Sequence, residues 1–171
     1  GRSLVFNDVR RFGRVAVVPR GDHSSLATLA ALGPEPFDPG FTPTVLRRGI
    51  NATTRAIKTA LLSQRIVAGL GNIYADEALW RAGIDPRRRG GLGARRAEAL
   101  HGAIVDVLGD AIGRGGTTLR DYRTLDGATG NYQQRLEVYG RNGRPCVRCG
   151  TALRSITLDA RTTTWCVRCQ R

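Results

Sequence analysis

The residues best suited to chemistry are four cysteines near the C-terminal end. They form two identical pairs, Cys146-Val147-Arg148-Cys149 and Cys166-Val167-Arg168-Cys169, with sixteen residues between the pairs. Two cysteines separated by two residues can bind one metal ion, and a second pair completes a tetrahedral four-sulfur site of the kind that holds zinc. Such a site has no open position for a substrate. We therefore expect one structural Zn²⁺ that stabilises the fold.

The alternative for these cysteines is a pair of disulfides. Disulfides are typical of secreted proteins, and we find no secretion signal in the sequence, so we favour zinc. The stretch between the pairs favours a hairpin, because Leu153, Ile156, Leu158 and residues 162–165 suit strands. Asp159-Ala160 supplies the turn.

Positive charge is the second large feature of the chain. The formal net charge of the 171 residues is +13, and of 27 Lys and Arg residues only Lys58 is a lysine. Such a chain favours a polyanionic partner. Compositional bias and an ordinary solvated basic face are the alternatives. No apolar run is long enough to cross a bilayer, and no basic amphipathic helix stands out, so we expect nucleic acid and no membrane.

Before residue 44 the chain shows little helical periodicity. Residues 4–6 and 14–18 are short strand-like runs, and two strands alone are marginal. We interpret them as the edge of a larger sheet, and the chain as a fragment. Residues 24–32 suit a short helix, and a proline-rich connector begins at Pro34.

A helical block follows the connector. We expect a short helix over residues 44–48, a helix capped by Thr53 or Thr54, a helix capped by Asn72, and a longer helix over about residues 94–113. In the last of these, an apolar stripe recurs at helical spacing and predicts a core face. The stripe comprises Ala97, Leu100, Ile104, Val107, Leu108, Ala111 and Ile112.

The junction at residues 68–74 (AGLGNIY) is the best candidate for anion binding. Glycines allow close approach of a backbone, and the first amides of a helix carry positive partial charge that suits phosphate. Asn72 could add a side-chain donor to a phosphate oxygen. It could equally serve only as the helix cap, and residue types alone leave both readings open.

Five further short motifs occur in the chain besides the cysteine pairs. They are residues 8–13 (DVRRFG), 32–36 (LGPEP), 71–79 (GNIYADEAL), 115–122 (GGTTLRDY) and 138–141 (VYGR). Together they resemble the formamidopyrimidine-DNA glycosylase family, bacterial enzymes that excise 8-oxoguanine and ring-opened purines. The resemblance extends over essentially the whole chain, and the combination is far more specific than any one motif.

The resemblance implies an α+β multidomain fold. Residues 1–33 would be the end of an N-terminal β-sandwich catalytic domain, of which only this remnant is present. Residues 34–130 would be a helix–two-turn–helix DNA-binding domain, and residues 131–171 a zinc-finger β-hairpin. The implied partner is double-stranded DNA with oxidised bases or abasic sites, bound by a monomer in the bacterial cytoplasm at the nucleoid.

The resemblance also assigns DNA contacts. Asn72 and Arg161 would bind phosphates, and Lys58 would face the lesion strand. Arg10 and Phe12 would fill the gap left by an everted nucleotide, where inserted groups offset the cost of unstacking. The loop over residues 115–132 would close on the extruded purine, with roles for Thr117, Thr118 and Tyr132.

No catalytic residue is expected within this chain. The nucleophile of the family is an N-terminal proline, which is assisted by a glutamate. Through a Schiff base formed by this proline, the enzymes act as both glycosylase and β,δ-lyase. This chain begins at Gly1. We interpret Glu77 as a partner of the helix dipole rather than a catalyst. The 171 residues alone are expected to bind DNA without cleaving it.

Two alternatives remain at this point. An enzyme of the endonuclease VIII type, acting on oxidised pyrimidines, is related, although residues 116–119 (GTTL) favour the purine enzyme. A zinc-dependent nucleic-acid-binding module without catalytic history would instead bind damaged and undamaged duplex equally, with strong salt dependence.

Overall fold

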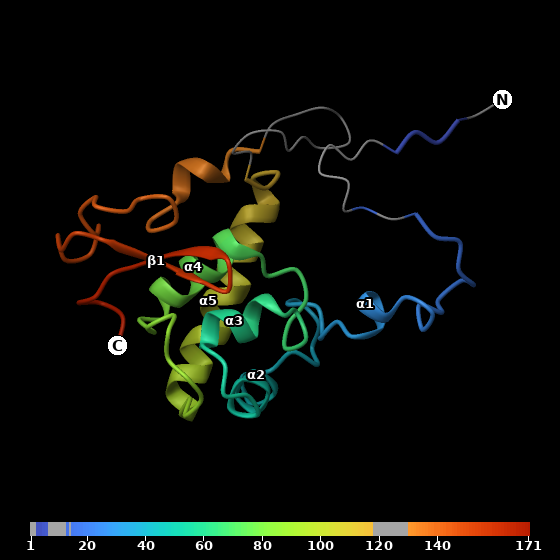
Figure 1. Cartoon of the computed structure of the whole chain (residues 1–171), viewed down its shortest axis with the longest axis horizontal. Coiled ribbons are helices and arrows are strands. Elements are labelled where there is room, and N and C mark those ends of the chain that lie inside the picture. The colour runs from blue at the N-terminus through green and yellow to red at the C-terminus, as the bar shows by residue number, and fades with distance from the viewer. Residues whose placement is uncertain (1–2, 7–12, 14, 118–129) are drawn as a thin grey trace. The chain divides into compact units, whose positions relative to one another are not determined.

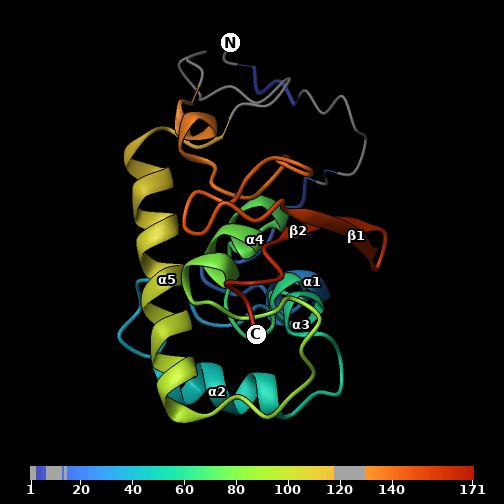
Figure 2. The ribbon, with the colours of Figure 1, turned by 90° about the vertical axis from the view of Figure 1, so that its left-hand side faces the viewer.

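The computed structural model describes residues 3–6, 13, 15–117 and 130–171. The chain separates into two units, residues 1–31 and residues 32–171. The helical block and the cysteine hairpin therefore lie together in the second unit, which is shown in two views in Figures 1 and 2. The three-domain division expected above stays a prediction.

The first unit contains one regular element among its described residues, the short helix α1 (Ala27–Ala30). Of the runs predicted as strands, residues 4–6 and 14–18, the described residues 4–6 and 15–18 form no strand in the part of the chain that the structure describes, and residue 14 lies outside it. Their side chains do not form a core either: Leu4 is 90% exposed and Val17 fully so. Two short runs without further strands cannot bury an apolar face.

Among the described residues of the second unit, four α-helices form its helical part. They are α2 (Pro43–Asn51), α3 (Ile57–Leu62), α4 (Asn72–Arg81) and α5 (Ala94–Gly113). The long helix α5 packs against α2 and α4, and α3 lies against α4. The predicted stripe on α5 is buried except at Ile112, whose side chain is 67% exposed. Ile112 lies in the last turn of α5.

Two helix starts differ from the prediction. Helix α2 is capped as its sequence suggests, because the Thr42 hydroxyl accepts a hydrogen bond from the Val45 amide and Pro43 opens the helix. Helix α3 begins later than expected, with Ala56 at its N-cap, and the Thr53 hydroxyl accepts from the Arg55 amide in a local turn instead. Gly71 precedes α4 as its N-cap, and the Asn72 side chain does not cap the helix.

A two-stranded antiparallel sheet follows the helices. Strands β1 (Arg154–Leu158) and β2 (Arg161–Trp165) pair from Arg154–Trp165 to Leu158–Arg161. The predicted turn is confirmed: Asp159 and Ala160 both have positive φ, 45° and 59°. This is the signature of the type I′ turn that matches the strand twist. A 3₁₀ turn, η1 (Tyr132–Arg135), lies ahead of the hairpin.

The hairpin is docked on the helical part. Strand β2 lies against α4, and its last three residues, 163–165, are buried. A small apolar cluster, formed by Trp80, Val138, Cys146, Leu153 and Cys166, joins the two parts. None of the helices in the described part of the chain is long and apolar enough to span a membrane.

Candidate metal centre and nucleic-acid surface

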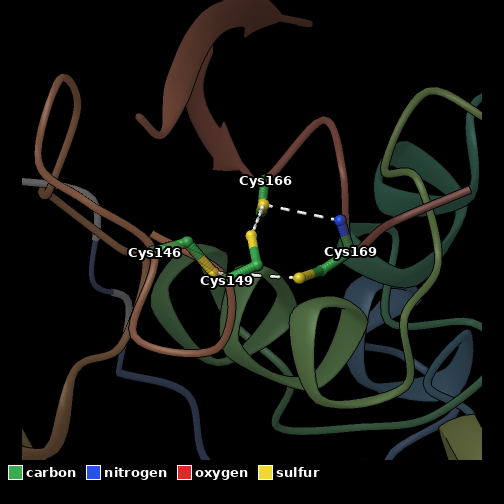
Figure 3. Close-up of side chains that lie close together, drawn as sticks. All are labelled: Cys146, Cys149, Cys166 and Cys169. Atoms are coloured by element: carbon green, nitrogen blue, oxygen red, sulfur yellow. Dashed lines mark hydrogen bonds between the residues drawn. The ribbon is translucent and has the colours of Figure 1, made fainter. Parts of the chain in front are cut away.

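The four cysteines converge on one point, as their spacing predicts. One pair lies in the loop before β1 and the other directly follows β2, and Figure 3 shows their side chains turned toward each other. The four sulfur atoms lie within 4.8 Å of one another. The Sγ atoms of Cys149 and Cys166 are 3.5 Å apart, and those of Cys146 and Cys169 are 3.9 Å apart.

These distances fit a zinc site. A tetrahedron with zinc–sulfur bonds of about 2.3 Å has sulfur–sulfur edges of about 3.8 Å, and no disulfide joins the four residues, all of which are free cysteines. The Cys169 amide lies 3.4 Å from the Cys166 sulfur and can donate to it, as amides do around thiolates. The cysteines therefore hold one structural Zn²⁺, and because all four positions are protein ligands, the metal serves the fold.

Arg148, which lies inside the first cysteine pair, attaches the metal loop to α4. Its guanidinium lies 3.8 Å from the centroid of the Trp80 ring and donates to the carbonyls of Trp80 and Arg81 at 3.0 and 3.2 Å. These carbonyls lie at the end of α4, where helical partners run out and a cation is favourable. Sequence reasoning missed this role, because Arg148 reads as one exposed arginine among many.

Gln170, just beyond the last cysteine, makes a second attachment. Its carbonyl oxygen accepts from the Cys166 amide at 2.8 Å, and its amide nitrogen donates to the Ile84 carbonyl at 2.9 Å. The side chain is 2% exposed. A buried amide with both ends satisfied fixes the second cysteine pair against the segment that follows α4.

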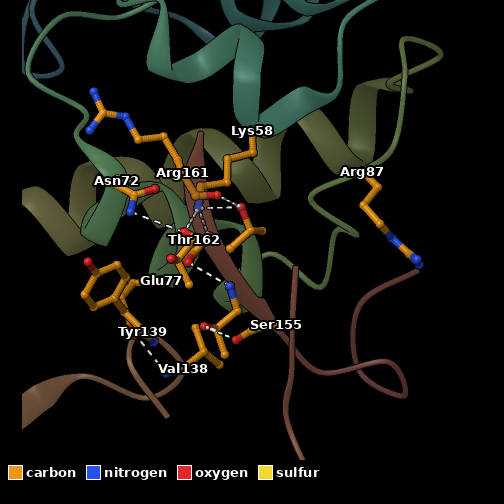
Figure 4. A network of polar contacts seen from close by, with 12 residues as sticks. Lys58, Asn72, Glu77, Arg87, Val138, Tyr139, Ser155, Arg161 and Thr162 are labelled. Atoms are coloured by element: carbon orange, nitrogen blue, oxygen red, sulfur yellow. Dashed lines mark hydrogen bonds and ion pairs between the residues drawn. The ribbon is translucent and has the colours of Figure 1, made fainter. Parts of the chain in front are cut away.

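Lys58 occupies the centre of the contact between the helices and β2 (Figure 4). Its ammonium is 2.7 Å from the Asp76 carboxylate, and it donates to the Thr162 carbonyl and the Thr163 hydroxyl, both at 2.9 Å. Asp76 in turn accepts from the Thr164 amide at 3.0 Å. Neither Lys58 nor Asp76 has exposed side-chain surface. The expected direct contact of Lys58 with DNA does not fit this arrangement, since its ammonium is already enclosed by the protein.

Burial dominates the electrostatics of this pair. It raises the pKa of Asp76 to about 6, against the opposing effects of Lys58 and of the Thr164 amide. It likewise lowers the pKa of Lys58, and Asp76 only partly counteracts that shift. Both changes have the same cause, the removal of water from around the two charges. Each charge therefore depends on the other, and removal of one would leave the other buried alone.

Asn72 lies beside this pair and connects the start of α4 to the hairpin. Its amide nitrogen donates to the Thr162 carbonyl at 3.2 Å, the same carbonyl that accepts from Lys58. Arg161, the neighbour of Thr162, is exposed. Figure 4 shows Asn72 and Arg161 on the same side of the hairpin, with the Arg161 side chain extending away from the strand. The two predicted phosphate-binding residues, distant in sequence, are thus brought together.

Glu77 has a role that the sequence did not reveal. Its carboxylate oxygens accept four hydrogen bonds of 2.8–3.2 Å from the amides of Glu137, Val138 and Tyr139. The side chain is fully buried, and burial raises its pKa although the three amides oppose the shift. Our interpretation of Glu77 as a helix-dipole partner is therefore wrong: the carboxylate fixes the segment that leads into the metal loop.

The expected lesion loop is described only at its two ends. The Thr117 hydroxyl is 3.1 Å from the Tyr74 hydroxyl. Tyr132 has no exposed surface and packs in the helical core, edge-on to Tyr74 at 5.6 Å between ring centroids. Burial raises the pKa of Tyr132 to about 12. The ring of Tyr132 is therefore enclosed by the helical core. Thr118, Arg10 and Phe12 lie outside the described residues.

Comparison with known proteins agrees with this architecture. Residues 32–123 match the model of the formamidopyrimidine-DNA glycosylase H2TH domain, and residues 143–171 match a zinc finger found in FPG and IleRS. The first match alone covers more than half of the chain. The chain belongs to the formamidopyrimidine-DNA glycosylase family. The resemblance of its motifs to that family is therefore confirmed.

Relatives of the family cover the chain almost completely. A formamidopyrimidine-DNA glycosylase of Stenotrophomonas maltophilia is 46% identical over the whole chain, which spans 63% of that protein. The crystal structure of MutM (Fpg) from Thermus thermophilus has a TM-score of 0.90 and 44% identity, over 95% of this chain and 62% of that one. A Lactococcus lactis FPG mutant in complex with Fapy-dG-containing DNA has a TM-score of 0.78 and 39% identity, over 86% of this chain and 54% of that one. The chain thus spans somewhat under two thirds of its relatives.

Proposed function

We propose that the chain is the DNA-binding and lesion-reading part of a base-excision repair glycosylase that removes oxidised purines, 8-oxoguanine and formamidopyrimidines, from duplex DNA. The observation that carries this proposal is the contact between Asn72 and the Thr162 carbonyl beside Arg161. It joins the start of α4 to the metal-bound hairpin at one exposed place, where amides, an amide side chain and a guanidinium can receive a DNA phosphate. The net charge of +13 supports a polyanionic partner.

Each predicted contact then has a proposed role. Asn72 and Arg161 bind backbone phosphates next to the lesion. Lys58 acts through the hairpin, because its ammonium holds the carbonyl of Thr162 and so the position of Arg161. Arg10 and Phe12 fill the space of the everted nucleotide, and Thr117 and Thr118 belong to the loop that closes over the base. A relative bound to Fapy-dG-containing DNA supports the class of lesion.

The chemistry proposed for the family is excision of the base followed by lyase cleavage at the abasic site. A secondary amine at an N-terminal proline forms a Schiff base with the sugar, which divides one difficult step into easier ones. We assign this amine to none of the 171 residues. We expect it to bind DNA as a monomer, and the glycosylase to act in the bacterial cytoplasm at the nucleoid.

Borohydride treatment tests whether the catalytic amine lies outside the 171 residues. Incubation of the 171-residue polypeptide with abasic-site DNA and borohydride should give no covalent adduct, because we assign no catalytic amine to these residues. A trapped adduct would show that an amine within these residues performs the chemistry, and it would contradict this assignment.

The phosphate role of Arg161 has its own test. Fluorescence anisotropy with a duplex that carries an abasic-site analogue should show weaker binding of Arg161→Ala than of the wild type. The slope of log K against log salt should be flatter by about 0.9, the value for one phosphate contact. Arg168→Ala removes an exposed arginine of the second cysteine pair and serves as the control. An unchanged slope for Arg161→Ala would contradict the assignment.

A further inference from the structure

A cleft of about 490 Å³ opens between α3 and the tip of the hairpin. It is distinct from the contact between Asn72 and Thr162, because neither residue lines it. Arginines and hydroxyls dominate its walls, with one carboxylate. The lining residues are Thr54, Arg55, Ala56, Thr59, Leu62, Ser63, Arg89, Leu158, Asp159 and Arg161.

The three arginines of the cleft are free to bind an anion. Arg55, Arg89 and Arg161 are exposed, and within the described part of the chain none of them forms an ion pair with a carboxylate. Arg87 and Arg114, by contrast, are each paired with an aspartate at 2.6–2.7 Å. Asp159 offsets only one of the three charges, so the cleft keeps a surplus of positive charge.

Backbone contacts explain how three distant segments contribute these arginines. Ala56 and Arg89 form an isolated antiparallel bridge, and the Ile57 amide donates to the Arg88 carbonyl at 2.7 Å. This brings the segment after α4 alongside the start of α3. The Lys58 ammonium donates to the Thr162 carbonyl and so holds the hairpin against α3. Arg161, next to Thr162, therefore lines the wall of the cleft that the hairpin forms. These hydrogen bonds fix the relative positions of the three segments that carry the arginines.

We propose that this cleft binds a further backbone phosphate of the DNA strand held by Arg161, with Arg55 and Arg89 as the residues that receive it. The proposal rests on the proposed function. Each strand of duplex DNA presents one phosphate per about 3.4 Å of helix axis, so a strand fixed at Arg161 carries further phosphates along the same cleft. Guanidinium groups bind phosphate through two parallel hydrogen bonds, and the hydroxyls of Thr54 and Thr59 can donate to the remaining oxygens.

The double variant Arg55→Gln/Arg89→Gln tests the cleft. Both side chains are exposed, so zinc content and the circular dichroism spectrum should match the wild type. In anisotropy titrations with the abasic-analogue duplex, affinity should fall roughly tenfold and the salt slope should flatten by about 0.9 to 1.8, for one or two lost phosphate contacts. Arg95→Gln/Arg96→Gln removes the same charge at the start of α5, outside the cleft, and should leave the slope within about 0.3 of the wild type.

A neutral linkage in the DNA locates the contact. Methylphosphonates placed one at a time along the duplex should weaken the wild type at the Arg161 phosphate and at a further phosphate of the same strand. The double variant should lose sensitivity at the further position only. If the double variant and the wild type have the same slope and the same pattern, while Arg161→Ala has a flatter slope, the cleft does not bind phosphate and the proposed function stands. If the wild type itself does not bind the duplex, the proposed function fails.

Discussion

Lys58 and Asp76 show how one buried ion pair can position a surface residue. The pair lies between α3, α4 and β2, and its hydrogen bonds reach the backbone of Thr162 and Thr164 on either side of Thr163. Two buried charges rarely add much stability, because desolvation offsets their attraction. The ion pair instead fixes the position of a strand: the only lysine of the chain holds β2, which carries Arg161, at a defined place relative to Asn72.

Lys58→Met should destabilise the chain by about 3–5 kcal/mol, because the Asp76 carboxylate would remain buried without its counter-charge. Urea unfolding of the zinc-loaded chain measures the change. Lys58→Met/Asp76→Asn removes both charges and should recover more than half of the loss. A single variant within about 1 kcal/mol of the wild type would show that the pair does not hold the hairpin.

Glu77→Gln should destabilise the chain by about 1–3 kcal/mol, because the new amide group would point a donor at backbone amides that now donate to the carboxylate. The same unfolding measurement applies. Glu98→Gln, on the exposed face of α5, is the matched control and should change stability by less than about 0.5 kcal/mol. Equal effects of the two variants would argue against the role of Glu77.

At the scale of single elements, sequence patterns predicted those features of the structure that are determined by residues close together in the sequence. The bounds of α5, the turn at Asp159 and Ala160, and the cysteine pairs follow from local spacing. The patterns did not predict side-chain contacts with residues that are distant in the sequence. The side chain of Asn72 donates to the Thr162 carbonyl instead of capping the helix, and nothing near residue 72 in the sequence indicates this partner.

The hairpin turn offers a test at this scale. Ala160 has a φ of 59°, a conformation that is unfavourable for a residue with a Cβ atom. Ala160→Gly should therefore stabilise the chain by roughly 1 kcal/mol, the order of the cost of a left-handed conformation for a residue with a Cβ atom, in a turn type that prefers glycine. Thermal unfolding of the zinc-loaded protein measures it, with Ala99→Gly, on the exposed face of α5, as a destabilising control. A lower melting temperature for Ala160→Gly would contradict the turn assignment.

At the scale of the whole molecule, the second unit is one structure with the metal at its edge. Arg148 and Gln170 attach the two cysteine pairs to the end of α4 and to the segment after it, while Lys58 and Asn72 attach β2 to α3 and α4. The sequence predicted both parts but not this docking, because contacts between residues sixty to one hundred positions apart leave no local periodicity.

From this arrangement we expect the proposed binding of DNA to require the metal. Without zinc the cysteine pairs lose the bonds that close the hairpin, and the free energy of metal binding is lost from the folded state. Arg161 would then no longer be held near Asn72, and the cleft beside α3 would lose the wall formed by the hairpin. The helical core should survive, since its buried residues do not include the cysteines.

The most direct measurement is the affinity of the 171-residue chain for an abasic-analogue duplex before and after removal of zinc, at fixed salt. Our account predicts one zinc per chain, salt-dependent binding when the metal is present, and a loss of roughly a hundredfold or more after chelation, reversed when zinc is added back. Metal-free chain that binds the duplex with the same affinity and the same salt slope would contradict it.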